Sequence, residues 1–311
     1  EERLKEEAVS GCPANTAQAG RARGCEGCPG QQFCLSSVAR EDPMQRKLDV
    51  RMKAISRKIL VLSGKGGVGK SSLSAELAAC LAVARGRKVA LLDVDICGPS
   101  APLLTQLSGS QVTASEYGWT VPSPAWSGGS LRVMSAGFLL AGRDVPVVWR
   151  GPRKTSLIRR LLADTFWGRR DFLIIDTPPG TSDEHLSVVA SLKNAQPDGA
   201  VVVTTPQQLS MATVRKELDF CRKMDIPVLG IVENMSGFAC PCCDEVTDIF
   251  LAGAGEKLAK ECGVPFLGKV PIDQRLSECA QAGESIMLTH PTSAAAKALE
   301  EICSAIEAAV A

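Results

Sequence analysis

The chain has 311 residues, 13 cysteines, a formal net charge of +1 at pH 7 and only 4% aromatic residues. A chain of this length can bury a core that needs no disulfide or metal to hold it together, so the cysteines call for another explanation. The near-neutral charge and the scarcity of aromatic rings argue against nucleic acid as a partner.

The first ten residues are acidic and lack an apolar stretch, so they do not resemble a secretory signal. The longest apolar runs fall far short of the roughly 20 residues that span a bilayer. We therefore expect a cytoplasmic protein in a reducing compartment, with no membrane partner and no disulfide framework.

Residues 1–56 are predicted to be a separate cysteine-rich extension and linker, because Gly, Pro, Gln and charged residues there cannot build a core. From residue 57 onward, short apolar strands alternate with helical stretches, which is typical of a mainly parallel sheet. The predicted strands are 59–63, 88–92, 131–135, 145–149, 172–176, 199–204, 228–234 and 266–270. The predicted helices are 70–85, 152–166, 183–192, 207–224, 253–262 and 292–310. Residues 108–129, rich in Ser, Gly, Trp and Pro, are predicted to be a surface excursion.

Residues 63–71, Ser-Gly-Lys-Gly-Gly-Val-Gly-Lys-Ser, follow a predicted strand and open a predicted helix. In that context, glycines let backbone N–H groups turn inward around phosphates, and the helix N-terminus favours negative charge. Lys70 is expected to reach the β- and γ-phosphates of ATP, and Ser71 to bind Mg²⁺. The predicted nucleotide contacts in this loop are Gly64, Lys65, Gly66, Gly67, Val68, Gly69, Lys70, Ser71 and Ser72. An incidental glycine-rich turn is the alternative.

Lys65 is a second lysine in a loop that Lys70 already serves. It suggests a role like that of an arginine finger, stabilising the charge that develops in phosphoryl transfer, and such a group can act across a dimer interface. Asp95 and Asp176 follow apolar strands, where carboxylates point into the ligand crevice of an open sheet. We assign Asp176 to the Mg²⁺ shell and Asp95 to orienting the attacking water, so the expected catalytic set is Lys65, Lys70 and Asp95. Solvated strand-end aspartates are the alternative.

Three segments carry a resemblance to the Mrp/Nbp ATPases, which are deviant-Walker proteins. They are 65–71, 93–100 (Asp-Val-Asp-Ile-Cys-Gly-Pro-Ser) and 176–183 (Asp-Thr-Pro-Pro-Gly-Thr-Ser-Asp). The resemblance implies an α/β, three-layer P-loop NTPase domain over 57–311 and a dimer that sandwiches nucleotide, with Lys65 crossing toward the partner's phosphates. It also implies that Asn234 recognises adenine, for which a turn-capping asparagine is the alternative.

Cys240 and Cys243 form a C-x-x-C pair in the run Cys-Pro-Cys-Cys. Two thiolates at this spacing can chelate a soft metal centre but cannot close a four-ligand site, so a second pair must come from elsewhere. The resemblance implies that it comes from a twin subunit and that the two pairs hold a bridging [4Fe–4S] cluster. A redox dithiol and an intersubunit zinc ion are the alternatives. Cys242 departs from the non-thiol residue usual between the pair, and ligation by Cys242 is a further alternative.

Four more cysteines, Cys12, Cys25, Cys28 and Cys34, lie in the N-terminal extension. Four thiolates there suit either a cubane cluster or tetrahedral zinc, and the spacing alone favours neither. A four-cysteine extension is similar to that of the larger scaffold subunit of the eukaryotic cytosolic iron–sulfur assembly system. The resemblance implies a [4Fe–4S] cluster at this site in each chain, although the gap from Cys12 to Cys25 is one residue shorter than usual.

The expected function is an ATP-hydrolysing scaffold, slow in isolation, that assembles a transient [4Fe–4S] cluster and transfers it to cytosolic and nuclear apo-proteins. The expected partners are a second copy or a shorter family member without the N-terminal cysteines, apo iron–sulfur proteins and downstream transfer factors. A partitioning or positioning ATPase with structural zinc is one alternative, but residues 292–310 have one Lys and three Glu, unlike a basic membrane-binding helix. A nitrogenase-reductase-like electron donor is another, but only Cys97 lies between the Asp95 and Asp176 motifs.

Overall fold

The computed structural model describes residues 21–28, 31–32, 42–140, 151–249 and 253–311. The chain divides into two compact units, 1–47 and 48–311. In the first unit, the described residues include a short 3-10 helix, Arg23–Cys25. The helix α3, Pro43–Lys53, crosses the division and buries Leu48 and Met52, where the charged sequence predicted a linker. The domain boundary after residue 56 stays a prediction.

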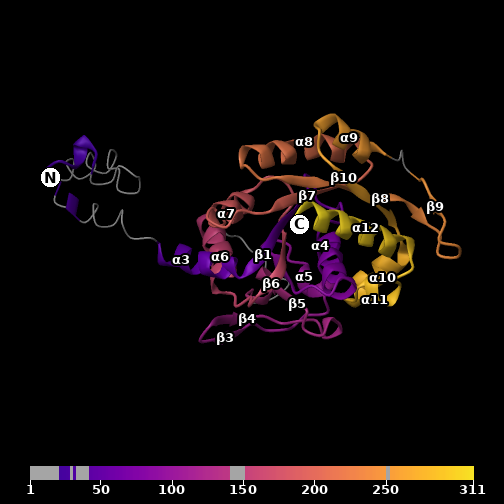
Figure 1. Cartoon of the computed structure of the whole chain (residues 1–311), viewed down its shortest axis with the longest axis horizontal. Coiled ribbons are helices and arrows are strands. Elements are labelled where there is room, and N and C mark those ends of the chain that lie inside the picture. Colours follow the sequence, from indigo (N-terminus) through magenta and orange to yellow (C-terminus); the bar gives the residue numbers. More distant parts are fainter. Residues whose placement is uncertain (1–20, 29–30, 33–41, 141–150, 250–252) are drawn as a thin grey trace. The chain divides into compact units, whose positions relative to one another are not determined.

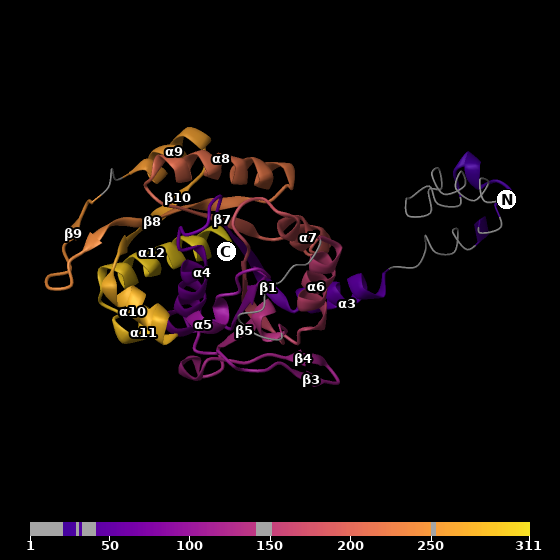
Figure 2. The same ribbon diagram turned by 180° about the vertical axis from the view of Figure 1, so that it is seen from behind.

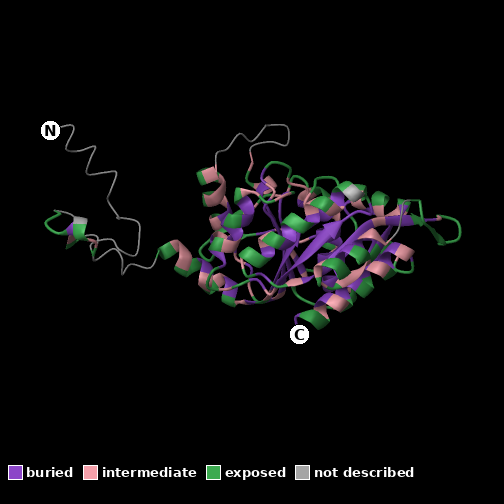
Figure 3. Cartoon of the chain, turned by 90° about the horizontal axis from the view of Figure 1, so that it is seen from above, coloured by how far each residue is buried: buried purple, intermediate pink, exposed green. Residues whose placement is uncertain are grey.

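A mainly parallel sheet forms the centre of the second unit, and its central strands are buried (Figures 1 and 3). The strand order is β10–β8–β7–β1–β6–β2–β5, and each neighbouring pair is parallel. The bounds are β1 Ile55–Leu62, β2 Val89–Asp93, β5 Leu131–Ser135, β6 Arg170–Asp176, β7 Gly199–Thr204, β8 Val228–Ala239 and β10 Phe266–Ile272. The predicted strand 145–149 lies outside the described residues.

Three short strands were not predicted. β9, Val246–Thr247, pairs antiparallel with the end of β8 and so makes a hairpin that extends the sheet. β3, Thr113–Ser115, and β4, Gly118–Thr120, form a separate antiparallel hairpin within the predicted surface excursion.

Helices cover both faces of the sheet. α8 (Gln208–Lys223) and α9 (Ala254–Cys262) lie on one face, and α4 (Lys70–Ala79) and α12 (Ala294–Ala309) lie on the other, as the opposite views of Figures 1 and 2 show. The remaining helices of this unit are α5 Ala101–Leu104, α6 Gly151–Asp164, α7 Asp183–Ser191, α10 Gln274–Ala282 and α11 Ile286–Thr289. The predicted helix 70–85 changes from α-helix to a π-helical turn at Cys80–Ala84.

Alternating side chains divide between the two cores, because successive residues of a strand point to opposite faces. Val201 and Val203 of β7 belong to the core that includes residues of α4 and α12. Val202, between them, packs with Val214 and Leu218 of α8. A strand buried on both faces explains the continuous apolar runs in the sequence, and the predicted α/β fold with a mainly parallel sheet is confirmed.

Because the strands are parallel, the carboxyl ends of β1, β6 and β2 lie at one edge of the sheet. The register places Asp176 beside Val61 on one side and beside Asp93 on the other. Two acidic strand ends therefore lie next to each other, close to the point where β1 leads into α4. This edge carries the glycine-rich loop.

Candidate functional site

The loop 63–69 joins β1 to α4 and encloses a cavity of about 320 Å³. It turns through positive φ angles at Gly67 (79°) and Gly69 (81°), which only glycine adopts without strain. The cavity is lined by residues 65–72 together with Ser63, Asp95, Gly98, Ser100 and Pro179. Of the predicted nucleotide contacts, the structure therefore gathers eight consecutive residues and leaves Gly64 and Asn234 outside the lining.

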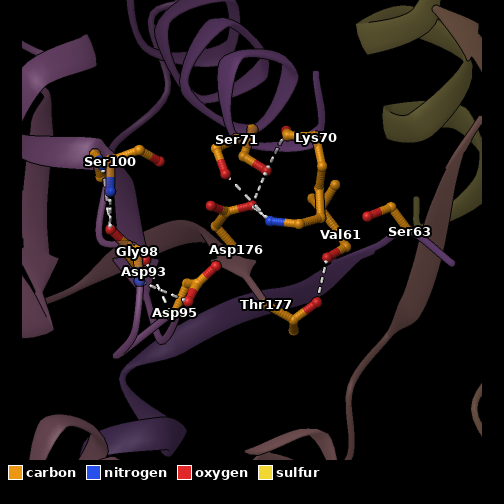
Figure 4. A network of polar contacts seen from close by, with 12 residues as sticks. Val61, Ser63, Lys70, Ser71, Asp93, Asp95, Gly98, Ser100, Asp176 and Thr177 are labelled. Atoms are coloured by element: carbon orange, nitrogen blue, oxygen red, sulfur yellow. Dashed lines mark hydrogen bonds and ion pairs between the residues drawn. The ribbon is translucent and has the colours of Figure 1, made fainter. Parts of the chain in front are cut away.

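Lys70 is the first residue of α4 and is 6% exposed. Its Nζ lies 2.6 Å from Oδ1 of Asp176 and 3.2 Å from Oγ of Ser71 (Figure 4). Ser74, one turn further along α4, donates its hydroxyl to the same Asp176 oxygen at 2.8 Å. The strand-end carboxylate thus compensates the charge of the lysine.

The other oxygen of Asp176, Oδ2, is buried and has no hydrogen-bond partner among the described residues. A buried carboxylate oxygen without a partner is costly, and a hydrated cation near the phosphates would supply one. Ser71 lines the cavity close by. The residues present therefore fit the predicted Mg²⁺ site, in which Ser71 and Asp176 hold the ion.

Asp93 is fully buried at the end of β2, and no role was predicted for it. Burial, and next the charge of Asp176, raise the pKa of Asp93 to about 7. Its carboxylate accepts hydrogen bonds from the backbone N–H groups of Asp95 and Ala101 and from the hydroxyl of Ser135. Asp93 therefore fixes the start of the loop that carries Asp95.

Asp95 reaches the cavity, as its assigned role requires. One of its oxygens, Oδ1, accepts the backbone N–H of Gly98 at 3.0 Å, which closes a tight turn beside the phosphate loop (Figure 4). Lys65 also lines the cavity and is exposed, and it forms no ion pair within the described chain. Both side chains are thus available to a ligand in the cavity.

Asn234 lies against the outside of the loop rather than in the cavity lining. Its Nδ2 donates to the carbonyl oxygen of Val68 at 2.8 Å, and a Cβ at Gly69 would come within 2.2 Å of that same nitrogen. The asparagine therefore supports the loop backbone in this structure. Adenine recognition by Asn234 stays a prediction.

Beyond Asn234, the strand β8 bulges before it reaches the cysteines. Val270 and Ile272, two residues apart in β10, pair with Asn234 and Phe238, which are four residues apart in β8. The strand β8 therefore contains two extra residues at this point. Met235 and Gly237 in the bulge have φ angles of 58° and 83°. The bulge sets the direction of the hairpin that follows.

Cys240 comes directly after β8, and its run of cysteines forms a tight turn. The carbonyl oxygen of Cys240 accepts the N–H of Asp244 at 2.9 Å, and the Cys240 N–H donates to Glu245 at 2.9 Å. The backbone N–H groups of Cys242 and then Cys243, which contact its sulfur, lower the pKa of Cys240. N–H groups directed at one sulfur favour its thiolate form.

The pKa of Cys243 shifts in the opposite direction. The N–H of Glu245 favours its thiolate, but the hydrogen bond with Cys240 and desolvation outweigh that contact, so the pKa of Cys243 is raised. The hydrogen bond between the two side chains thus favours the thiolate form of Cys240 over that of Cys243. Within the described residues, no group of three or more Cys, His, Asp or Glu side chains is arranged to hold a metal ion.

An arginine that the sequence analysis missed ties this turn to the body of the domain. Arg275, at the start of α10, forms an ion pair with Asp244 of the turn and another with Asp273, at 3.0 Å. Asp273 also caps α10 through the N–H of Arg275 at 3.0 Å. The only local signal was an Asp just before a helix start, because Asp244 is 31 residues away.

Of the N-terminal cysteines, Cys25 and Cys28 are described, whereas Cys12 and Cys34 lie outside the described residues. Cys25 is buried and Cys28 is exposed, and the N–H of Cys28 donates to the carbonyl oxygen of Cys25 at 3.1 Å. The predicted C-x-x-C spacing thus closes a turn.

Among the helices of the described chain, none combines the length and the apolar character that a membrane span requires.

A parallel sheet with a glycine loop between β1 and α4, a lysine at the helix start and a carboxylate on the neighbouring strand together define a P-loop NTPase. The ParA family described as "NUBPL iron-transfer P-loop NTPase" matches residues 54–307. The chain belongs to this family, which confirms the predicted relationship at the level of the Mrp/NUBPL-type ATPases.

Solved structures of similar proteins share the P-loop NTPase fold of this chain. A nucleotide-binding protein from Archaeoglobus fulgidus in complex with ADP is 38% identical, with a TM-score of 0.67 over 77% of this chain and 91% of that one. The cell division ATPase MinD from Pyrococcus furiosus is 23% identical, with a TM-score of 0.59 over 81% of this chain and 99% of that one. MinD complexed with Mg-ADP from Pyrococcus horikoshii is 20% identical, with a TM-score of 0.59 over 81% and 96%. The two MinD structures share the fold.

Proposed function

We propose that this protein is an ATP-hydrolysing scaffold that assembles a [4Fe–4S] cluster between two subunits and transfers it to cytosolic and nuclear apo-proteins. One observation carries the proposal: a single strand, β8, contacts the phosphate loop through Asn234 and ends at a pair of thiols, of which Cys240 has a pKa lowered by backbone N–H groups. Membership of an iron-transfer family supports the choice of cargo.

In the nucleotide half, Lys70 would bind the β- and γ-phosphates of ATP, and Ser71 and Asp176 would hold Mg²⁺, which would neutralise phosphate charge. Asp95 orients the attacking water from its place in the cavity wall. Lys65 is exposed and has no carboxylate partner in the described chain, which suits a residue that extends toward the phosphates of a second subunit. ADP in the Archaeoglobus fulgidus structure supports nucleotide as the ligand of this cavity.

In the thiol half, Cys240 and Cys243 supply two of the four ligands that a cubane cluster needs. Metal ligation requires thiolates, so the lowered pKa of Cys240 favours binding. The second pair comes from another copy or from a shorter family member, and the cluster is the cargo. Nucleotide state sets the subunit geometry, and with it the cluster affinity.

The N-terminal cysteines support assignment to the larger scaffold subunit of the cytosolic iron–sulfur assembly system. In this proposal Cys12, Cys25, Cys28 and Cys34 hold a second [4Fe–4S] cluster in the extension 1–56, while residues 57–311 form the ATPase domain. The protein acts in the cytoplasm, without nucleic acid or membrane partners. Apo iron–sulfur proteins and transfer factors receive the cargo.

Anaerobic reconstitution followed by iron, sulfide and zinc analysis tests the proposal. The full chain is compared with a Cys240→Ala/Cys243→Ala variant and with a Cys25→Ala/Cys28→Ala variant, which keeps α3 in place. We expect each double variant to lose the iron and sulfide of one site only, and Cys242→Ala to retain both. Zinc alone in every sample would contradict the scaffold function.

The Lys65→Ala variant tests the hydrolytic role. We expect it to retain nucleotide binding, because Lys70 and the loop N–H groups stay in place, but to lose hydrolysis, since partner-supplied cations raise phosphoryl-transfer rates by roughly 10³–10⁵. Binding is measured with a fluorescent nucleotide and turnover by phosphate release. Turnover equal to that of the wild type would remove Lys65 from the mechanism.

A further inference from the structure

A second cavity, of about 550 Å³, opens at the amino-terminal edge of the sheet. Its wall includes Ser56 at the start of β1, Lys88 just before β2, and Arg170 at the start of β6. Since the strands are parallel, these positions lie at the edge opposite the phosphate loop. The volume is in the range of small-molecule sites, roughly 300–1,000 Å³.

The lining is strongly basic. Lys53, Lys88, Arg169 and Arg170 contribute four positive charges and Asp171 one negative charge, which leaves a net charge of three positive. The Asp171 carboxylate is also engaged, because it accepts the backbone N–H of Lys88 at 2.7 Å. No carboxylate lies within ion-pair distance of the Lys53, Lys88 or Arg169 side chain in the described part of the chain.

Basic residues next to the cavity show a different pattern. Arg57 and Lys58 both pair with Asp198, at 3.1 and 3.7 Å. Arg87 pairs with Glu307 at 2.9 Å. Carboxylates thus balance the charges of these neighbouring lysine and arginine residues, whereas the charges of the lining residues are not balanced. A ligand that enters the cavity therefore meets an uncompensated positive charge.

Arg170 places one of these positive charges at a fixed position in the cavity wall. It is 7% exposed, and backbone carbonyl oxygens hold its guanidinium, that of Trp167 at 2.9 Å from Nε and that of Ser130 at 3.2 Å from Nη1. Burial, and next the nearby charge of Arg132, lower the pKa of Arg170 to about 10. A buried arginine held by carbonyl oxygens retains its charge, and an anion in the cavity would stabilise it.

We propose that this basic cavity binds a compact, multivalent, phosphate-bearing small molecule, at the same time as nucleotide occupies the phosphate loop. Arg170 supplies a preorganised cation in the wall, and Lys53, Lys88 and Arg169 are exposed arms that close around the anion. Three net positive charges match a diphosphate better than a single phosphate. Because side-chain charges rather than a cradle of N–H groups do the binding, the affinity falls steeply with salt.

The experiment uses the full chain saturated with Mg-ADP, so that the phosphate loop is filled, and titrates inorganic pyrophosphate by calorimetry at constant ionic strength. We expect saturable binding that weakens at least tenfold in a Lys88→Ala/Arg169→Ala variant, whose altered side chains are exposed and leave Arg170 untouched. A Lys216→Ala/Lys223→Ala variant removes the same charge from the exposed face of α8 and should bind like the wild type.

Three results would overturn the proposal. One is the absence of saturable heat, or equal binding by all three proteins. Another is a signal that disappears as ADP is raised, which would assign pyrophosphate to the phosphate loop. The third is tighter binding of citrate than of pyrophosphate, which would make the ligand a polycarboxylate. None of these outcomes bears on iron and sulfide content, so this inference and the scaffold function fail separately.

Discussion

The phosphate loop and the cysteine turn are both tight backbone turns, one beside a cavity and the other around a sulfur. The loop ends at a buried ion pair: Lys70, the first residue of α4, and Asp176, the last residue of β6, are 6% and 1% exposed and pair with each other. The turn lies on a hairpin at the end of β8, with Cys242 and Cys243 exposed and Arg275 as its tie to α10.

This difference separates stability from function. Loss of Lys70 removes the partner of a buried charge, so it weakens the fold as well as nucleotide binding. Damage to the turn changes side chains that water already reaches, so it removes ligands and leaves the fold intact. The following experiments test that contrast, beginning with the largest expected effect.

Lys70→Ala should cost about 3–5 kcal/mol of unfolding free energy, because it leaves the Asp176 carboxylate buried without its cation. Urea unfolding without nucleotide measures the loss. Lys65→Ala is the matched control from the same loop: its side chain is exposed and unpaired in the described chain, so we expect a change below about 0.5 kcal/mol. Equal losses in the two variants would show that the buried pair adds no stability.

Gly69→Ala should destabilise the protein by about 2–3 kcal/mol, from left-handed backbone strain together with a clash against Asn234. The control is Gly86→Ala, where φ is 64° and a new Cβ has nothing within 4 Å, so only the strain of about 1 kcal/mol remains. Thermal unfolding compares the two. If Gly86→Ala proves as costly as Gly69→Ala, contact between β8 and the loop is unimportant.

Stability should fall as the pH rises from about 5 to 8, because burial raises the pKa of Glu76, on α4, to about 7. Between the unfolded pKa near 4.5 and the folded value near 7, the folded state holds a proton that the unfolded state releases, so the unfolding free energy decreases with pH. Asp93 contributes in the same direction.

The Glu76→Gln variant tests this assignment, since the amide cannot titrate. It should reduce the loss of stability between pH 5 and pH 8 by on the order of 2 kcal/mol in urea unfolding. Cys240→Ser, in the exposed turn, should leave the slope as in the wild type. An unchanged slope in Glu76→Gln would place the titrating groups elsewhere.

Arg275→Ala should lower the unfolding free energy by about 1–2 kcal/mol, because it removes the guanidinium from the exposed Asp244 and from the buried Asp273, which keeps its helix-capping bond from the backbone N–H of residue 275. It should also raise the rate at which iodoacetamide alkylates Cys240 and Cys243 severalfold, because the turn loses its link to α10. Arg215→Ala, which breaks another surface pair with Glu261, serves as control. Identical alkylation rates in both variants would mean that the turn holds its shape unaided.

Local patterns were sufficient to predict the sheet and the phosphate loop. The central strands are buried on both faces, so their sequences are continuous apolar runs. Gly67 and Gly69 of the loop have positive φ angles, which few residues other than glycine adopt. The α3 helix was missed because it buries only Leu48 and Met52 among charged neighbours.

Contacts between distant residues were not predictable. Asn234 donates a hydrogen bond to Val68, which lies 166 residues earlier in the chain, and Arg275 donates one to Asp244, which lies 31 residues earlier. The basic cavity brings together Lys53, Lys88 and Arg169 because β1, β6 and β2 are neighbours in that order. Strand order is a property of the whole fold, so no local spacing reveals such a site.

The bulge in β8 has a consequence for how the protein can vary in length. Side chains alternate along a strand, so one residue inserted between the bulge and Cys240 would turn the hairpin over and present its cysteines to the opposite side of the sheet. Insertions of two residues, matched on β9, would preserve that side and move the thiols outward by about 7 Å. Related proteins with longer or shorter hairpins should therefore differ by even numbers of residues in each arm.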